Sequence, residues 1–186
     1  MVTQKNNVLI LASGGIDSTA CIQFYKDLGF EVELVFLNLG QPSHKNELNA
    51  VTKISEYYGC KLNILNVSGL NITKGFILGR NAALIFLALM SFSKSFGIIA
   101  IGIHSGTTYY DCGENFLNQV QSIIKEYSGD LVQVAAPFLT WNKKEIANYC
   151  SLEKVPIHLT YSCELGLDQP CNECLTCKDL RKIYEC

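Results

Sequence analysis

An alternation of short apolar runs with longer amphipathic segments constrains the fold of this chain most strongly. The first run, residues 8–12, has no polar position, as expected of a strand buried on both faces of a sheet. The segment after it carries Ile22, Tyr25 and Leu28 at helical spacing. This alternation predicts a doubly wound α/β domain around a five-stranded, mostly parallel sheet. The expected strands are 8–12, 31–37, 61–67, 98–103 and 131–136, and the expected helices are 18–28, 46–58, 80–96, 115–127 and 142–152. Segment 80–96 is apolar on nearly every side, so we expect it to be the most buried helix.

The pattern changes after Pro156 to a tail rich in cysteines and turn-forming residues. We therefore expect an α/β domain over residues 1–156 and a C-terminal subdomain, residues 157–186, packed on the same core. The 15 basic and 17 acidic residues leave no positive excess for phosphate backbones, so direct nucleic-acid binding is not expected. The longest apolar run is nine residues, about half of what a bilayer requires, and no secretory signal is recognisable. These features predict a cytoplasmic protein that does not bind membranes and whose thiols stay reduced.

The segment Ser13-Gly-Gly-Ile-Asp-Ser18 lies where the first strand meets the first helix. Ligands of doubly wound sheets bind at such junctions, and glycines let the backbone approach an anion closely. The helix N-terminus and the hydroxyls of Ser13 and Ser18 would supply donors, and Asp17 would cap the helix or help hold Mg²⁺. The alternative is an ordinary glycine turn with an Asp or Ser cap. The chain contains no Walker motif and no dinucleotide-binding GxGxxG motif after a strand.

Four cysteines lie within 15 residues near the C-terminus, in the pattern Cys163-x7-Cys171-x2-Cys174-x2-Cys177. Two overlapping C-x2-C steps form tight turns that bring several thiolates together, which indicates a metal site. We favour Zn²⁺ over an iron–sulfur cluster, and a shell closed by four thiolates implies a structural role. The alternative is a set of unrelated buried cysteines. Cys21, Cys60 and Cys150 are expected in the core, and no role is assigned to Cys186.

The loop at 13–18 resembles the pyrophosphate loop (PP-loop) of the ATP-pyrophosphatase superfamily. Together with the four-cysteine pattern, it makes the chain similar to the 7-cyano-7-deazaguanine synthase (QueC) family. Further matching stretches are NLGQ at 38–41, GRN at 79–81, YDC at 110–112, APFL at 136–139, NKKE at 142–145 and LTYSC at 159–163. The resemblance implies an adenine nucleotide α-hydrolase-like fold and an ATP-dependent carbon–nitrogen ligase of queuosine biosynthesis. Such an enzyme adenylates the carboxylate of 7-carboxy-7-deazaguanine and converts it with ammonia to the amide and then to the nitrile.

The resemblance also implies which residues form the site, with ATP, Mg²⁺ and a structural Zn²⁺ as cofactors and a homodimer as the assembly. Catalytic roles fall to Ser13, Asp17, Ser18, Arg80, Asp111 and Lys143, and nucleotide binding to Ala12, Ser13, Gly14, Gly15, Asp17, Ser18, Thr19, Gln41, Arg80 and Asn81. Arg80 would hold phosphate or carboxylate, Asp111 the deazapurine or Mg²⁺, and Lys143 the departing pyrophosphate. The alternative for each is an ordinary surface charge. Tyr109 and Tyr110 are candidates for stacking or for packing, and His44 and His104 are expected to be loop histidines.

The chain departs from the family pattern in segments that border the substrate pocket. Residues 68–78 are only eleven where family members carry a longer insertion, and Gly113 stands where an arginine usually follows the Asp-Cys pair. A shortened lid would admit an acceptor larger than ammonia. This favours a second hypothesis, a QueC-like ligase of antiviral defence that stops at the amide and attaches the deazaguanine to an amine of a partner protein. A third is a non-catalytic, zinc-stabilised nucleotide-binding protein. Cys112, in the YDC stretch, is a further candidate for a functional role.

Overall fold

The computed structural model describes residues 6–72, 77–92, 97–107 and 109–184. Five strands form one parallel sheet in the order β3-β2-β1-β4-β5. They are β1 (Asn7–Leu11), β2 (Glu31–Asn38), β3 (Lys61–Asn66), β4 (Ile98–Ile101) and β5 (Gln133–Ala135). Because β1 lies between β2 and β4, the strand order reverses at β1, and the space beyond its carboxyl end is where such sheets bind ligands.

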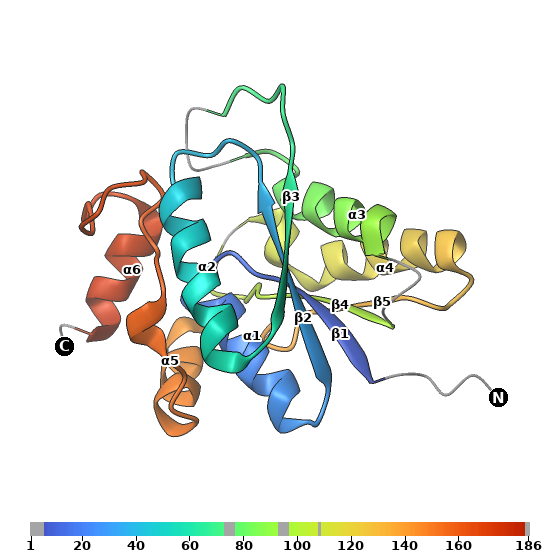
Figure 1. The fold of residues 1–186 in the computed structure, drawn as a ribbon, viewed down its shortest axis with the longest axis horizontal. Helices are drawn as coiled ribbons and strands as arrows, with labels where there is room; N and C mark the ends of the chain where they lie inside the picture. Colours follow the sequence, from blue (N-terminus) through green and yellow to red (C-terminus); the bar gives the residue numbers. More distant parts are fainter. Residues whose placement is uncertain (1–5, 73–76, 93–96, 108, 185–186) are drawn as a thin grey trace.

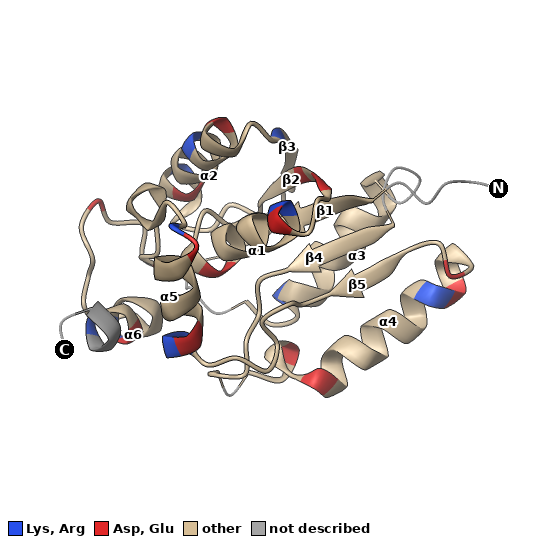
Figure 2. Cartoon of the chain, turned by 90° about the horizontal axis from the view of Figure 1, so that it is seen from below, with Lys and Arg blue, Asp and Glu red and all other residues tan. Residues whose placement is uncertain are grey.

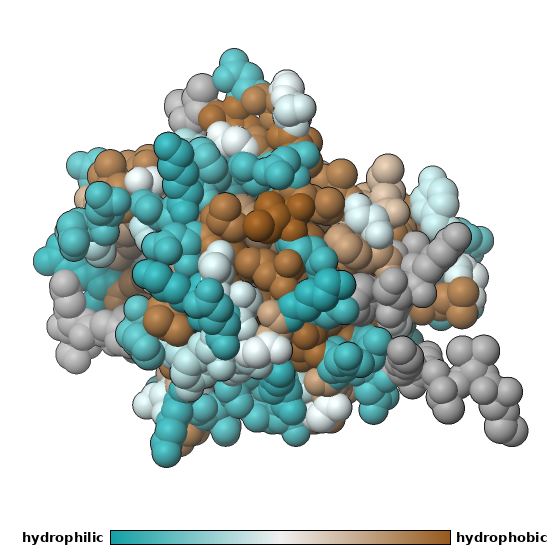
Figure 3. Space-filling model, viewed as in Figure 1, coloured by the Kyte–Doolittle hydropathy of each residue, from teal (hydrophilic) through white to brown (hydrophobic). Residues whose placement is uncertain are grey.

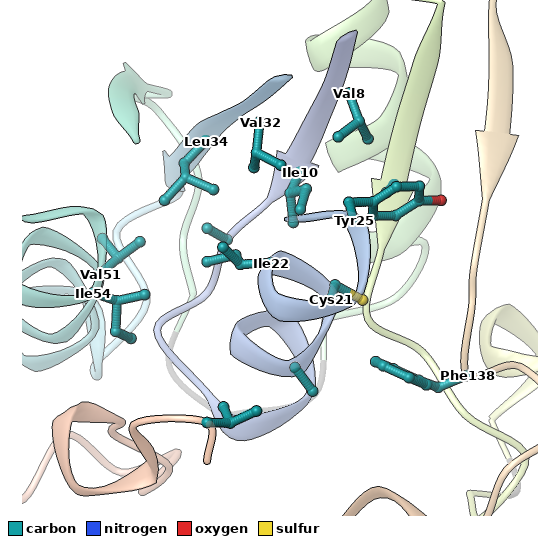
Figure 4. Packing of buried hydrophobic residues seen from close by; sticks show 14 of the residues in the cluster. Val8, Ile10, Cys21, Ile22, Tyr25, Val32, Leu34, Val51, Ile54 and Phe138 are labelled. Carbon is teal, nitrogen blue, oxygen red and sulfur yellow. The ribbon is translucent and has the colours of Figure 1, made fainter. Parts of the chain in front are cut away.

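Helices cover both faces of this sheet (Figure 1). One face carries α1 (Ile16–Asp27), α2 (His44–Tyr58) and α5 (Lys143–Leu152), and the other carries α3 (Arg80–Phe92) and α4 (Glu114–Ser128). Alternate residues of β1 serve the two layers: Val8 and Ile10 pack under α1 (Figure 4), whereas Leu9 and Leu11 pack under α3 and α4. This arrangement confirms the predicted doubly wound α/β fold.

The five strands and five helices lie where the alternation predicts them, and their ends differ from the predicted ones by at most two residues. The exception is segment 80–96, whose last four positions are not part of α3 as the structure gives it. Residues 93–96 are outside the described part of the chain. The prediction that this segment is the most buried helix is wrong. Only Asn81, Ile85, Ala88 and Leu89 of α3 are buried, and Met90 is 80% exposed. α1 buries more of its residues because it packs between the sheet and α5, whereas α3 contacts the sheet along a single stripe.

The C-terminal segment contains a helix that the sequence pattern does not predict. After a short 3₁₀ turn, η2 (Ile157–Leu159), the chain forms the cysteine-rich loop and then α6 (Leu175–Tyr184), which packs against α5 (Figure 1). Two hydrogen bonds connect this C-terminal segment to the loop after β1 and to α2. The Tyr161 amide donates to the Gly14 carbonyl at 2.9 Å, and the Asn46 side chain donates to the Gly166 carbonyl at 3.1 Å.

The surface shows two general features. In the view of Figure 2, basic and acidic residues alternate along α2, whereas the charged residues of α4 lie near its two ends. Apolar side chains gather in the middle of the face in Figure 3, over β3, whose Ile64 is 46% exposed because β3 is an end strand of the sheet. Within the described ranges, every helix is too short or too polar to cross a bilayer.

Candidate nucleotide-binding cleft and metal site

A cleft of about 290 Å³ opens at the carboxyl ends of the central strands. Its walls come from the loop after β1, the segment after β2, the start of α3, the loop after β4, the start of α5 and the C-terminal segment with α6. Six separate parts of the chain thus meet at the point where the strand order reverses. This is the position that doubly wound sheets use for ligands.

The loop between β1 and α1 requires glycine for two physical reasons. Gly14 has a φ of +77°, and a Cβ built on it would lie 2.7 Å from the Glu47 carbonyl oxygen. Gly15 is the N-cap of α1, and no side chain caps that helix end. Asp17 is a first-turn residue of α1 and forms an ion pair elsewhere, so the structure does not support the alternative of a turn with an Asp or Ser cap.

Hydroxyl groups brace the same loop. The Gly15 amide donates to Ser13 Oγ at 3.3 Å, and Ser18 Oγ donates to the Gly15 carbonyl at 3.0 Å. The hydroxyls of Ser13 and Ser18 lie 3.2 Å apart and both residues line the cleft, with Ala12 and Gly15 beside them. Thr19, also expected at the site, is buried behind the loop, where its hydroxyl donates to the Gly15 carbonyl at 2.8 Å. The helix end and the two serines therefore present a cluster of donors to the cleft.

Asp17 and Lys143, 126 residues apart in sequence, meet in the cleft. Lys143 Nζ donates to Asp17 Oδ2 at 2.5 Å. Asp17 Oδ1 is buried and has no hydrogen-bond partner among the described residues. Lys143 is the first residue of α5, and its position is set by a capping box: Asn142 accepts from the Lys144 and Glu145 amides, while the Glu145 carboxylate accepts from the Asn142 amide.

His104 is the functional candidate that the sequence analysis missed. It lies in a loop, as expected, but it is only 5% exposed, and its Nε2 is 3.9 Å from Asp17 Oδ2. Burial lowers the pKa of His104 below its ordinary value; the charge of Asp17 opposes this effect and that of Lys143 adds to it. The signal was available in the sequence, because His104 follows directly on the end of an apolar strand, at the ligand-binding edge of the sheet.

The start of α3 forms another wall of the cleft, lined by Arg80 and Asn81. Asp111, expected to contact substrate or metal, does not line the cleft. Its carboxylate accepts from the Asn81 amide at 3.4 Å, and its carbonyl accepts from the Asn81 side chain at 3.0 Å. Asp111 therefore contacts the start of α3 through Asn81 and is not itself among the residues that line the cleft. Cys112 does line the cleft, and burial raises the pKa of its thiol, so it is a neutral group there.

Gln41 also lines the cleft, and both the oxygen and the nitrogen of its side-chain amide are hydrogen-bonded. Its oxygen accepts from the Leu39 amide at 2.8 Å, and its nitrogen donates to Glu47 at 2.7 Å. Of the two tyrosines, Tyr109 lines the cleft, whereas Tyr110 packs edge-on against Phe116 and donates to Gln119. The packing alternative therefore holds for Tyr110. His44, expected in a loop, begins α2 instead and contacts the Gln41 carbonyl through Nδ1.

The four C-terminal cysteines converge as their spacing predicts. The sulfur atoms of Cys163, Cys171, Cys174 and Cys177 all lie within 4.8 Å of one another. Burial raises the pKa of the Cys163 thiol, but backbone amides outweigh it and bring the pKa down to about 6. Burial and a hydrogen bond with Cys174 raise the pKa of Cys177 to about 12. Four cysteine sulfurs this close together match the donor set of a metal site, so this cluster could hold a metal ion.

The cysteine cluster borders the cleft. Glu164, next to Cys163, lines the cleft and accepts from the Thr176 hydroxyl at 2.6 Å, and Thr176, next to Cys177, also lines the cleft.

Of the cysteines expected in the core, Cys21 and Cys150 are buried and Cys60 is half-buried. Cys186 is outside the described residues.

Comparisons with known proteins agree with this geometry. The family model described as "Queuosine biosynthesis protein QueC" matches residues 7–78 and 69–185. The chain is 31% identical to a 7-cyano-7-deazaguanine synthase of Sulfurihydrogenibium sp. (strain YO3AOP1), over 94% of this chain and 92% of the relative. It is 30% identical to the protein of the same name from Aquifex aeolicus (strain VF5), over 94% of each chain.

Solved structures show the same fold at low sequence identity. NMN synthetase from Francisella tularensis superposes with a TM-score of 0.56 at 13% identity, covering 92% of this chain and 72% of that one. The NH3-dependent NAD synthetase from Campylobacter jejuni subsp. jejuni NCTC 11168 superposes with a TM-score of 0.55 at 17% identity, covering 85% of this chain and 68% of that one. These likenesses agree with the expected doubly wound α/β fold, and the family match extends over nearly the whole chain. This protein belongs to the QueC family.

Proposed function

We propose that this protein uses ATP to activate the carboxylate of 7-carboxy-7-deazaguanine and converts it with ammonia to the amide and then to 7-cyano-7-deazaguanine. One observation carries the proposal: the phosphate loop, Asp17 and Lys143 converge on a single cleft in a fold of the QueC family. Relatives at 30–31% identity are named for that product. The coarser conclusion, a synthase or ligase, rests on those names and on the synthetase neighbours.

The residues of the cleft fit a nucleoside triphosphate with Mg²⁺. Asp17 Oδ1 is a buried carboxylate oxygen without a partner in the described chain, and Mg²⁺ prefers such oxygen ligands. Gly14 lets the loop turn closely against α2, Gly15 lines the cleft, and the start of α1 offers amide donors to a phosphate. Bound Mg²⁺ would neutralise charge on the phosphates. Gln41, which also lines the cleft, is our candidate for contact with the base or ribose.

The proposed reaction has two activations. A carboxylate oxygen of the substrate attacks the α-phosphorus, the bond to the β-phosphate oxygen breaks, and pyrophosphate leaves. Ammonia then attacks the acyl carbon, loses a proton, and displaces AMP with the former carboxylate oxygen. A second ATP activates the amide oxygen in the same way, and loss of AMP and of the amide protons gives the nitrile.

Charge stabilisation and positioning by this chain would supply the catalysis. Lys143 would exchange Asp17 for the departing pyrophosphate, whose negative charge grows as the bond breaks. Arg80, exposed at the start of α3, would hold the substrate carboxylate against the α-phosphorus. Asp111 acts indirectly, by fixing the Asn81 backbone at that helix start. Ser13 and Ser18 add hydroxyl donors to the phosphate loop.

We propose Zn²⁺ as the ion of the four-cysteine cluster. Tetrahedral Zn²⁺ with Zn–S bonds of about 2.3 Å places its sulfurs about 3.8 Å apart, which suits sulfur atoms within 4.8 Å of one another. Four thiolates leave no position for water, so the ion has a structural role. An iron–sulfur cluster is the alternative that elemental analysis and the visible spectrum distinguish.

A second candidate function is a ligase that stops at the amide and joins the deazaguanine to an amine of a partner protein. The observation that favours it is that this chain lacks residues its relatives carry, and we expect the shortening to fall in residues 68–78. The alignment with the Sulfurihydrogenibium relative spans 208 positions, more than the 186 residues of this chain, so the relative carries residues that this chain lacks. The two family matches meet at residues 69–78, within the segment that we expect to be shortened.

Mass spectrometry of a single reaction mixture distinguishes these functions. The metal-loaded protein is incubated with ATP, Mg²⁺, 7-carboxy-7-deazaguanine and ammonium, with the Asp17→Asn variant as the inactive control. The proposal predicts AMP, pyrophosphate and the nitrile, with the amide as an intermediate. AMP and amide without nitrile would support the second candidate. Release of no AMP with any carboxylate would contradict both and favour a non-catalytic nucleotide-binding protein.

A further inference from the structure

His104 is a buried side chain of the cleft that has no role in the proposed reaction. It lies in the loop after β4, 5% exposed, with its ring between the start of α1 and the start of α5. The charged groups that act on it are Asp17 of α1, Lys143 of α5 and Asp179 of α6. A ring held in this position from several elements has little freedom, so the atoms that it presents to the cleft are fixed by its other contacts.

One of those contacts fixes the proton on the ring. The Gly106 amide donates to His104 Nδ1 at 3.0 Å. A backbone N–H can only donate, so Nδ1 carries no hydrogen, and the neutral ring carries its proton on Nε2. Residue 106 has to be glycine for this contact, because a Cβ there would lie 2.8 Å from Nδ1. His44 has the opposite arrangement, since its Nδ1 is 2.7 Å from the Gln41 carbonyl and must therefore carry the proton.

The protonated Nε2 of His104 faces Asp17. It lies 3.9 Å from Oδ2, the same oxygen that Lys143 contacts, while Oδ1 has no partner in the described chain. A distance of 3.9 Å is longer than a hydrogen bond, so the carboxylate has to move toward the ring for the two groups to bond. We propose that His104 is a positioning residue for Asp17: its neutral Nε2–H holds Oδ2 and keeps Oδ1 turned toward the cation of a bound nucleotide.

A neutral donor suits this position for an electrostatic reason. Lys143 neutralises Asp17 while the two are paired, and it would leave Asp17 when a triphosphate attracts it. A second cation at Oδ2 would again cancel the charge that a divalent ion needs. The neutral imidazole orients the carboxylate and leaves its charge available. The inference rests on the proposed function only in taking a nucleotide with a divalent cation as the ligand of the cleft.

The first test reads the tautomer directly. Long-range ¹H–¹⁵N spectra of the ¹⁵N-labelled full-length protein at neutral pH report which ring nitrogen of each of the three histidines carries hydrogen. The His104 signals are assigned as those lost in His104→Gln. We expect His104 as the neutral Nε2–H form and His44 as the Nδ1–H form. A proton on Nδ1 of His104 would overturn the proposal.

The second test measures cation binding without the chemical reaction. Mn²⁺, detected by electron paramagnetic resonance, is titrated into the protein with a non-hydrolysable ATP analogue. We expect His104→Leu to weaken Mn²⁺ binding about tenfold, the usual loss when a partner of a metal ligand is removed. His104→Gln keeps an N–H donor of similar reach and should recover most of that loss. His158→Leu is the matched control at an exposed histidine and should leave the affinity unchanged.

Unchanged Mn²⁺ affinity in His104→Leu, or an equal loss in the Leu and Gln variants, would contradict the positioning role. If His104→Leu does not fold, the tautomer of the unaltered protein and the affinity of His104→Gln still decide. Both experiments are carried out without a deazaguanine substrate. A protein that passes both tests but forms no nitrile contradicts the proposed reaction alone, and a protein that forms nitrile but fails these tests contradicts the His104 role alone.

Discussion

The two carboxylate oxygens of Asp17 have different surroundings, and the proposed chemistry depends on that difference. Oδ2 contacts Lys143 and faces His104, whereas Oδ1 is buried without a partner in the described chain. A buried carboxylate oxygen that makes no hydrogen bond is costly unless a ligand satisfies it. Under the proposed function, a bound cation would restore the free energy that is lost at Oδ1.

Lys143 provides the most informative substitution at this scale. Lys143→Met keeps most of the side-chain length and removes the charge, so it should lower kcat about 100- to 1,000-fold, the range seen when one donor to a developing negative charge is removed. The KM for ATP should change much less, because the charge develops in the transition state. Steady-state pyrophosphate release measures both constants.

Lys144→Met is the matched control, because Lys144 is the next residue of α5 and is exposed. It should retain the kinetics of the unaltered protein. Equal losses in the two variants, or a Lys143→Met effect confined to the KM for ATP, would contradict the assignment of Lys143 to the departing pyrophosphate.

Individual residue types were predictable from the sequence, but their pairings were not. Asp17 and Lys143 belong to two separate motifs, and only the fold brings Lys143 Nζ to 2.5 Å from Asp17 Oδ2. The role expected for Asp111 stays a prediction: the YDC stretch indicated a residue of the cleft, and in the structure its carboxylate accepts from the Asn81 backbone amide. His104 has no motif partner, so its role depends on contacts that arise only from tertiary packing.

At the scale of elements, the start of α5 determines where Lys143 lies. The Asn142 side chain accepts from two backbone amides, and Glu145 completes the capping box. Asn142→Ala should lower the free energy of unfolding by about 1 kcal/mol, since the first-turn amides lose their acceptor. Urea unfolding followed by circular dichroism measures the change.

Asn118→Ala serves as the control for that substitution. Asn118 is exposed in the interior of α4, where alanine is the better helix former, so stability should stay equal or rise slightly. A loss at Asn118 as large as that at Asn142 would mean that the capping box has no special contribution.

The helices and strands differ in how far the sequence predicts them. β1 is recognisable because a continuous apolar run of this length is typical of a strand buried on both faces, and β2 because residues 34–37 form such a run. α6 was missed because its sequence begins among closely spaced cysteines, which favour turns, and because the helix depends on packing against α5. α3 was expected to be more buried than it is, since apolar composition alone does not show how many sides of a helix are covered.

At the scale of the whole molecule, the cysteine cluster adjoins the cleft, and we expect the two to be coupled. Cys174 and Cys177 flank Leu175 and Thr176, which begin α6 and line the cleft. Removal of the ion with a chelator should therefore lower the thermal midpoint of unfolding and weaken nucleotide binding together. Differential scanning calorimetry and titration with an ATP analogue measure the two effects.

Cys174→Ser should reproduce both effects, whereas Cys60→Ser, outside the cluster, should reproduce neither. Metal analysis should give about one zinc per chain, the stoichiometry of a four-thiolate site. Iron together with visible absorbance would identify a cluster instead, and a chelated protein with unchanged stability and nucleotide affinity would contradict the structural role.

The central claim is that ATP transfers its AMP group to a carboxylate oxygen of the substrate, and oxygen labelling tests it most directly. The substrate, 7-carboxy-7-deazaguanine, is prepared with ¹⁸O in the carboxylate and incubated with the protein, ATP, Mg²⁺ and ammonium. Mass spectrometry then determines where the label resides. The account predicts ¹⁸O in the phosphate group of AMP. Unlabelled AMP, or label found in inorganic phosphate with formation of ADP, would contradict it.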